Sequence, residues 1–231
     1  MDKKVKLSVV MPTLNEEKSV GKVIGDIQKY AKDYDLEVVI VDSSTDRTPR
    51  IAEEMGARVI RQEPRGPGRA LLLGLKEAKG DILMMTDCDD TYPMEDIPKF
   101  VGYIQQGYDF VNGNRINDLH DNMPRFNRFG NWAFAFLVRT LFGINTRDVT
   151  SGMRMYTREL FHSSQWEGNL AFWTEIIIKA KLGGFKYLDV PIMYRPRIGV
   201  PTLNAWKSSK ALLLCILKYR FNLGFIDLKK L

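Results

Sequence analysis

The sequence predicts an α/β protein whose mostly parallel sheet carries helices on both faces. The first half of the chain alternates short apolar, β-branched runs with helix-length segments in the order β-α-β-α-β-α-β. This order is typical of a parallel sheet covered on both sides. The 231 residues are 45% hydrophobic and 27% charged, so the chain has ample material for a core and disorder is not expected.

Local patterns indicate where each element of the first half lies. The β-branched run at 6–11 and the apolar run LEVVIV at 36–41 both stop at turn residues, as strands do. Residues 17–32 carry apolar side chains at helical spacing. The same reasoning predicts a helix at 46–55, a strand at 58–61, a helix at 68–78 and a strand at 81–86.

The second half keeps the alternation less regularly. We expect helices at 93–106, 127–142, 173–182 and 204–221, and strands at 110–113, 154–157 and 186–194. No repeat, linker or low-complexity segment divides the chain. We therefore expect one catalytic domain over residues 1–203, followed by an amphipathic helix and tail at 204–231 that meets a membrane surface or an interface.

Charge and cysteine content restrict the class of partner. A net charge of +6 and an isoelectric point near 9.2 favour an anionic partner. The basic residues are scattered without a nucleic-acid reader motif, so we expect no nucleic acid. The two cysteines, Cys88 and Cys215, predict neither a disulfide framework nor a zinc site. No apolar run approaches the ~20 residues that span a bilayer. We expect a cytoplasmic protein that lies on the membrane surface at most.

Acidic residues follow three of the expected strands. The segments after these strands are PTLNEE at 12–17, DSSTD at 42–46 and DCDD at 87–90. Ligands of parallel α/β sheets bind beyond the carboxyl ends of the strands, so these segments mark the candidate site. Neither GxGxxG nor GxxxxGK[ST] is present, which disfavours a dehydrogenase and a P-loop kinase.

The DCD segment suits a divalent cation. Asp87 and Asp89 are two residues apart in extended chain, so both carboxylates can face one Mg²⁺ or Mn²⁺. Such an ion would hold a nucleoside diphosphate and stabilise its charge as it leaves. The alternative is a turn that caps the next helix. For Asp42 there are two interpretations: it binds a ribose or base, or it is a turn aspartate. Glu16 can be a helix-start residue, which the helix dipole favours.

Six motifs in order carry a family resemblance. They are VVMPTLNEE, IVDSSTDRT, GPGRALLLGLKEAKGD, MTDCDDTYP, GNR and TSGMR. Together they resemble the family 2 glycosyltransferases, which have the GT-A fold, over residues 7–203. Within that family they are most similar to the dolichyl-phosphate mannose and glucose synthases and their prokaryotic relatives.

The resemblance implies roles for individual residues. It makes Asp87 and Asp89 the metal-binding pair, with Asp89 also catalytic, while Thr91 stands where mannose synthases often carry a glutamine, which leaves a third metal ligand open. Asp42 would read the base or the ribose. The residues expected to bind the nucleotide sugar are Pro12, Leu14, Glu16, Asp42, Asp87 and Cys88.

Arginines are expected on the acceptor side. The resemblance implies that Arg115 of GNR is catalytic and faces the sugar phosphates or the acceptor phosphate, and that Arg125 and Arg128 also face the acceptor phosphate. Arg197 matches a family arginine and is expected to be catalytic. The family's Ser-Lys pair is replaced by Pro201-Thr202, so Arg195 or Lys207 is a candidate for the missing charge, unless the acceptor differs.

These expectations combine into one predicted activity. The resemblance implies inverting transfer from a UDP- or GDP-sugar. We favour a polyprenyl (dolichyl) phosphate acceptor, because its anionic oxygen needs no strong base. The alternative is a saccharide hydroxyl in cell-surface glycan synthesis, with Glu175 or Asp148 as the base. A non-catalytic sugar-nucleotide-binding protein is a further alternative, against which the intact DxD argues.

Basic and tryptophan-bearing apolar segments at 127–142 and 204–221 suit a membrane surface. Alternatively, these segments pack on the sheet or form a homo-oligomer.

Overall fold

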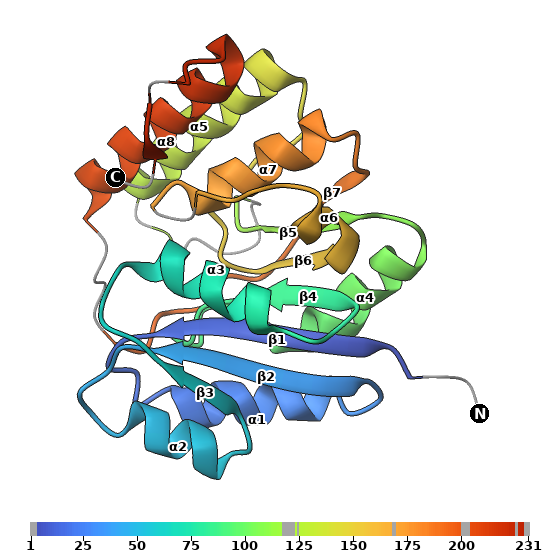
Figure 1. Ribbon diagram of the computed structural model, residues 1–231, viewed down its shortest axis with the longest axis vertical. Helices are drawn as coiled ribbons and strands as arrows, with labels where there is room; N and C mark the ends of the chain where they lie inside the picture. Colours follow the sequence, from blue (N-terminus) through green and yellow to red (C-terminus); the bar gives the residue numbers. More distant parts are fainter. Residues whose placement is uncertain are drawn as a thin grey trace.

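One seven-stranded sheet runs through the protein (Figure 1). The computed structural model describes residues 4–116, 123, 125–167, 170–199, 204–224 and 226–228. The strand order is β3-β2-β1-β4-β6-β5-β7. The strands are β1 Lys6–Thr13, β2 Asp35–Asp42, β3 Arg58–Arg61, β4 Ile82–Met85, β5 Phe110–Asn114, β6 Arg154–Thr157 and β7 Tyr187–Pro191.

The sheet is mostly parallel, as predicted, and β6 is the exception. It pairs antiparallel with both β4 and β5, while the other neighbouring strands pair in parallel. The chain leaves β5 at its carboxyl end and re-enters the sheet at the same edge, so β6 must run in the opposite direction. This insertion brings the segment before β6 to the edge where β1, β2, β4 and β5 end.

Helices cover both faces of the sheet, which confirms the predicted fold class (Figure 1). One face carries α1, α2 and α4, and the other carries α3 and α5 to α8. The five-residue helix α6 was not predicted, because it is too short to show a period. The helices are α1 Val20–Tyr30, α2 Thr48–Glu54, α3 Pro67–Glu77, α4 Ile97–Gln105, α5 Arg125–Phe142, α6 Arg158–His162, α7 Phe172–Leu182 and α8 Ala205–Phe221, with a 3-10 turn η1 at Met94–Asp96.

Strand β1 explains how the sequence builds two cores. Leu7, Val9 and Met11 face the cluster that includes α1, while Val10 faces the cluster that includes α3 and Leu71. Side chains alternate between the faces of a strand, so a continuous apolar run supplies both cores. β1 lies between β2 and β4 in the sheet, so its carboxyl end is flanked by the carboxyl ends of two parallel strands.

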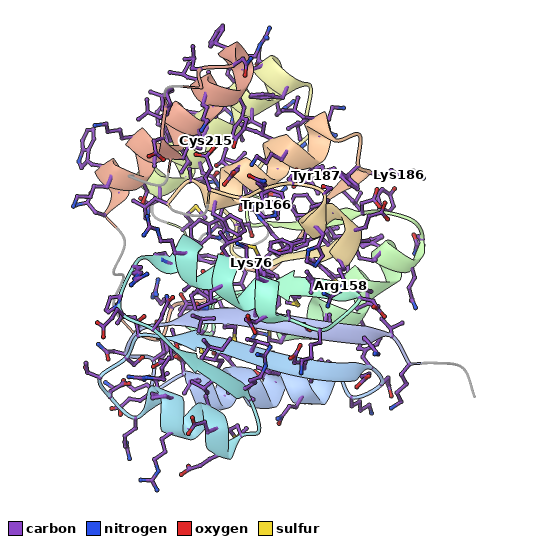
Figure 2. The ribbon with its side chains drawn as sticks, in the orientation of Figure 1. Lys76, Arg158, Trp166, Lys186, Tyr187 and Cys215 are labelled. Atoms are coloured by element: carbon purple, nitrogen blue, oxygen red, sulfur yellow. The ribbon has the colours of Figure 1, made fainter. Side chains whose placement is uncertain are left out.

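Helix α8 packs on α5 and α7 (Figure 1). Its buried residues include Leu212 and Cys215, and Cys215 lies on the same side of the sheet as Trp166 (Figure 2). Trp206 at the other side of α8 is 82% exposed. None of the described helices is both long enough and apolar enough to span a bilayer. The expectation that 204–231 meets a membrane surface stays a prediction.

Candidate active site

Hydrogen bonds tie the loop after β1 to the loop after β2. Asn15 adopts the left-handed conformation, with φ 59°. Its backbone N–H donates to Oγ of Ser44 at 2.7 Å, and its Oδ1 accepts from the N–H of Thr45 at 2.9 Å. The N–H of Glu16 donates to Oγ1 of Thr48 at 2.8 Å. The expected donor-binding segment around Leu14 and Glu16 is therefore held in one arrangement at the sheet edge.

Asp42 is buried and surrounded by donors. Its Oδ1 accepts from the hydroxyls of Thr13 and Ser44, both at 2.6 Å. Its Oδ2 accepts from the N–H of Ser44 at 3.0 Å and from Nη1 of Arg61. A carboxylate offers about four acceptor positions, and the four donors just named occupy all of them. Asp42 thus holds Arg61, a half-exposed residue that was not predicted as part of the site, beside the loop after β2, where its Nη2 also donates to the carbonyl oxygen of Ser44 at 2.8 Å.

The DxD carboxylates follow β4, as expected, and differ in their surroundings. Asp89 is buried, and its Oδ1 accepts from the N–H and the hydroxyl of Thr91 at 3.1 and 2.5 Å. Oδ2 of Asp89 lies 3.2 Å from Nη1 of Arg197. No hydrogen bond or ion pair reaches the Asp87 carboxylate from any described residue. Burial and the neighbouring charge of Asp89 raise the pKa of Asp87 to about 7.

This pair fits a divalent cation that takes few ligands from the protein. Two adjacent carboxylates, one without a hydrogen-bonding partner among the described residues, are hard oxygen donors of the kind that Mg²⁺ and Mn²⁺ prefer. In the described part of the chain, no group of three or more His, Cys, Asp or Glu could hold a metal ion. Substrate phosphate and water would have to complete the coordination. Thr91 uses its hydroxyl to orient Asp89, and its role as a third ligand stays open.

Cys88 and Pro12 were expected to contact the nucleotide sugar. The Cys88 side chain points into the core, away from the two aspartates, because it lies between them in extended chain. Burial raises the pKa of its thiol, which stays protonated. Only the backbone of Cys88 is available to a ligand. Pro12 is a half-buried residue of β1, paired with Val41 of β2.

Tyr92 links the DxD segment to the TSGMR segment. Its buried hydroxyl accepts from the N–H of Gly152 at 2.6 Å and from Nη1 of Arg115 at 3.2 Å. A Cβ atom on Gly152 would lie 2.6 Å from Oδ2 of Asp87. Both motifs stand out in the sequence, but the contact between them was not predicted. The adjacent Tyr in DCDDTYP and the Gly in TSGMR were the available signals.

Arg115 is paired with Asp148. Its Nε donates to Oδ2 at 2.7 Å and its Nη2 to Oδ1 at 2.9 Å, a bidentate arrangement. Burial alone would raise the pKa of Asp148, but Arg115 and a hydrogen bond from Asn131 hold it below its usual value. The guanidinium also lies over the Tyr194 ring, 5.3 Å from its centroid. These contacts already engage most of the N–H donors of Arg115. Its role toward a phosphate stays a prediction.

The segment after β7 crosses the DxD motif. The N–H of Arg195 donates to the carbonyl oxygen of Thr91 at 2.9 Å, and that of Ile198 donates to the carbonyl oxygen of Asp89 at 3.0 Å. Arg197 lies between them, beside Asp89. The motifs around Glu16, Asp42, Asp89, Arg115 and Gly152 thus meet at one edge of the sheet, whereas GPGRALLLGLKEAKGD runs along α3 to the opposite edge.

Comparison with known proteins decides the family. The family model described as glycosyl transferase family 2 matches residues 8–164. The chain belongs to glycosyl transferase family 2. The predicted resemblance is confirmed, and with it the GT-A fold, since the structures it matches are GT-A glycosyltransferases.

Two curated relatives and one solved structure illustrate the similarity. The dolichyl-phosphate hexose transferase of Haloferax volcanii is 46% identical over 92% of each chain. The low-salt glycan biosynthesis hexosyltransferase Agl6 of the same organism is 34% identical over 94% of this chain and 55% of its own length. Glucosyl-3-phosphoglycerate synthase from Mycobacterium tuberculosis, crystallised with Mn²⁺, UDP and phosphoglyceric acid, matches with a TM-score of 0.75. It is 25% identical, over 93% of this chain and 78% of its own.

The two carboxylates considered as bases for a hydroxyl acceptor are engaged elsewhere in this glycosyltransferase. Asp148 holds Arg115. Glu175 is buried, 2.7 Å from Nζ of Lys179, and accepts from the hydroxyl of Tyr219 at 3.0 Å and from the N–H of Glu167 at 3.1 Å. Both carboxylates stabilise the fold around them.

A pocket of about 300 Å³ lies beside α5 in this glycosyltransferase. Its wall combines arginines with apolar side chains, and Arg128, one of the expected acceptor residues, is among them. The side chain of Arg125, and Pro201-Thr202, lie outside the described residues. The pocket is lined by Ile116, Arg128, Trp132, Ala135, Phe136, Arg139 and Arg147.

Proposed function

We propose that this family 2 glycosyltransferase moves a sugar, with inversion, from a UDP- or GDP-sugar to a polyprenyl (dolichyl) phosphate at the membrane surface. The observation that carries the proposal is the pocket beside α5, where arginines and exposed aromatic rings lie together. The name of the 46%-identical relative, dolichyl-phosphate hexose transferase, supports the same acceptor.

The pocket suits an anion attached to an apolar chain. In the described part of the chain, the side chains of Arg139 and Arg147 have no carboxylate partner, so their positive charges are balanced by no acid. Guanidinium groups bind phosphate through planar, paired donors. Ile116 in the pocket wall directly follows Arg115, which connects the pocket to the site edge. A phosphate held here would lie on the acceptor side of the donor.

Aromatic side chains continue from the pocket along α5. Phe129, Trp132 and Phe136 are 66%, 53% and 53% exposed, and their rings stack in sequence with centroids 5.9 Å apart. We call these three residues the aromatic stripe. Exposed aromatic rings beside arginines are suited to the boundary between lipid headgroups and acyl chains. We therefore propose that the protein is peripheral, on the cytoplasmic face of the membrane, and that the stripe contacts the lipid chain of the acceptor.

The chemistry needs little from the protein beyond placement. An oxygen of the acceptor phosphate attacks the anomeric carbon and forms a C–O bond, while the C–O bond to the nucleoside diphosphate breaks on the opposite side. The acceptor oxygen is already anionic, so no side chain has to remove a proton, and the engagement of Asp148 and Glu175 supports this choice over a hydroxyl acceptor. Arginines would hold the two anions together.

The donor side would use the residues at the sheet edge. Pro12, Leu14 and Glu16 are proposed to line the nucleotide, and Asp42, whose acceptor positions are occupied, is proposed to act there by orienting Arg61. Asp87 and Asp89 are proposed to hold Mg²⁺ or Mn²⁺, which would neutralise charge on the leaving diphosphate. The Mn²⁺ and UDP in the mycobacterial structure support a metal-dependent donor site. A contact between two copies of the chain is the alternative use of the exposed surface of α5 and α8.

The test is an assay with a defined acceptor. The protein is incubated with Mn²⁺ or Mg²⁺, UDP- and GDP-sugars in turn, and a short polyprenyl phosphate, and glycolipid and nucleoside diphosphate are measured by mass. We expect glycolipid with one donor, and its loss in Asp89→Asn and with chelator. The double change Arg139→Gln and Arg147→Gln should raise KM for the polyprenyl phosphate and leave donor hydrolysis unchanged. Glycosylation of saccharides alone would overturn the proposal.

A further inference from the structure

Arg197 lies between two carboxylates of the candidate site. Its Nη1 is 3.2 Å from Oδ2 of Asp89, and its Nη2 is 3.6 Å from Oε1 of Glu16. The guanidinium is partly exposed, whereas the Asp89 side chain is buried. Arg197 is thus the residue through which the loop after β1 and the DxD segment share one positive charge.

The backbone holds Arg197 in this position. Ile198 donates its N–H to the carbonyl oxygen of Asp89. Gly199 has φ 105°, and a Cβ atom there would lie 3.4 Å from Oε2 of Glu16, so the chain passes close to that carboxylate. The backbone is held at Arg195 and at Ile198, whose N–H groups donate to the carbonyl oxygens of Thr91 and Asp89, while the side chain of Arg197 between them reaches the site with rotatable bonds. The guanidinium can therefore change partner without a rearrangement of the segment.

Only one oxygen of Asp89 is available for exchange. The backbone and hydroxyl of Thr91 both donate to Oδ1, so this oxygen is used within its own turn. Oδ2 is the oxygen that Arg197 contacts. Oδ2 is therefore the oxygen that Asp89 could offer to a cation held together with Asp87. Arg197 and a divalent cation would then compete for one atom.

We propose that Arg197 is an exchangeable partner of Asp89, and that its guanidinium leaves Oδ2 when a divalent cation binds there and moves to the diphosphate of the donor. This inference rests on the proposed function for the cation and the nucleotide. Arg197 opposes cation binding to the nucleotide-free protein and favours binding of the diphosphate afterwards. Cation and nucleotide binding are consequently coupled, each strengthening the other.

The test measures Mn²⁺ binding to the full chain without nucleotide, through the electron paramagnetic resonance signal of free Mn²⁺. Arg197→Gln is expected to tighten Mn²⁺ binding by about fivefold, because the competitor is removed. Arg195→Gln is the matched control, since it removes the same charge two residues away, where the side chain pairs with Asp90 and Glu95. It should change Mn²⁺ affinity by less than about twofold.

The second half of the test adds UDP or GDP at saturating Mn²⁺. Arg197→Gln is expected to weaken binding of the nucleoside diphosphate that the wild type prefers by about tenfold, because a charge-assisted contact is lost. Arg197→Lys keeps a cation near Asp89 but lacks the planar fork. Arg197→Lys should bind Mn²⁺ with the affinity of the wild type but bind the nucleoside diphosphate more weakly than the wild type does.

Unchanged or weaker Mn²⁺ binding in Arg197→Gln would overturn the inference. An equal increase in Mn²⁺ affinity in Arg195→Gln would also overturn it. Thermal unfolding of each variant establishes that it is folded. The measurement involves no acceptor, so a failure of the polyprenyl phosphate proposal leaves this result interpretable. Loss of Mn²⁺ binding in Asp89→Asn identifies the ion that is measured as the one at the DxD motif.

Discussion

Gly152 lies against the Asp87 carboxylate, with only 2.6 Å between the place of a Cβ atom on Gly152 and Oδ2 of Asp87. Real Cβ atoms are never this close to an oxygen, so a side chain at 152 must displace Asp87 or the loop. The N–H of Gly152 is held by the Tyr92 hydroxyl, which limits movement of the loop. The glycine of TSGMR therefore sets the position of Asp87, one of the two aspartates proposed to hold the cation.

Replacement of Gly152 by alanine tests this relationship. Gly152→Ala is expected to weaken Mn²⁺ binding and to lower kcat/KM by about a hundredfold, since ~1 Å misplacement of a catalytic group has costs of this size. Gly102→Ala is the control, because a Cβ atom on that glycine of α4 meets nothing within 4 Å. It should leave activity unchanged. Wild-type activity in Gly152→Ala would contradict the packing argument.

Glu37 stabilises the fold in a pH-dependent way. Its carboxylate accepts from the hydroxyl of Ser8 at 2.6 Å and the N–H of Lys79 at 2.8 Å, and pairs with Arg58 at 3.0 Å. Burial raises its pKa, but these partners outweigh burial and hold the pKa below the usual 4.5. Because the folded pKa is the lower one, the stabilisation is present above the unfolded pKa and is lost as pH falls through the folded pKa.

Glu37→Gln is therefore expected to lower the free energy of unfolding by about 1–2 kcal/mol at pH 7. The difference from wild type should shrink as pH falls below 4.5, the usual glutamate pKa. Urea unfolding at a series of pH values measures this. Glu54→Gln removes an exposed pair with Arg50 and serves as the control, with almost no effect expected. A difference independent of pH would show that the charge of Glu37 is not responsible.

The aromatic stripe should matter for lipid acceptors alone. Trp132→Ala combined with Phe136→Ala is expected to raise KM for polyprenyl phosphate by about tenfold or more. Each ring is about half exposed, so covering it contributes roughly half of the ~1.5–3 kcal/mol of a fully buried apolar side chain. Binding to vesicles that contain anionic lipid should fall in parallel. Leu182→Ala removes a similarly exposed apolar side chain from α7 and should have little effect. Equal vesicle binding by all variants would argue against a membrane role for α5.

Glu175 separates the phosphate acceptor from the hydroxyl acceptor. Glu175→Gln breaks a buried pair with Lys179 and should lower stability by about 3 kcal/mol. Below the unfolding temperature of the variant, its kcat is expected to equal that of the wild type. Thermal unfolding measures the loss of stability. Initial rates at about 20 °C or lower, within the usual range of maximum stability, measure kcat. A stable but inactive Glu175→Gln would instead indicate a catalytic base.

The regular elements could be predicted because their signals are local. Alternation and helical spacing are properties of a few neighbouring residues, and the expected strands and helices are found with shifts of a few residues at their ends. The helix α6 and the direction of β6 were not predicted. A five-residue helix has no measurable period. The direction of a strand depends on where the chain re-enters the sheet, which no local pattern contains.

The fold class, the family resemblance and the motifs at the carboxyl edge of the sheet could be predicted from the sequence, because strand and helix patterns and motif order are properties of short stretches of chain. Which side chains contact one another became known only from the folded structure. Arg115 meets Asp148 across 33 residues of chain, and Tyr92 meets Gly152 across 60. Both contacts exist because β6 inserts between β4 and β5. Contacts between strand ends depend on the order of strands in the sheet, which is a property of the whole chain.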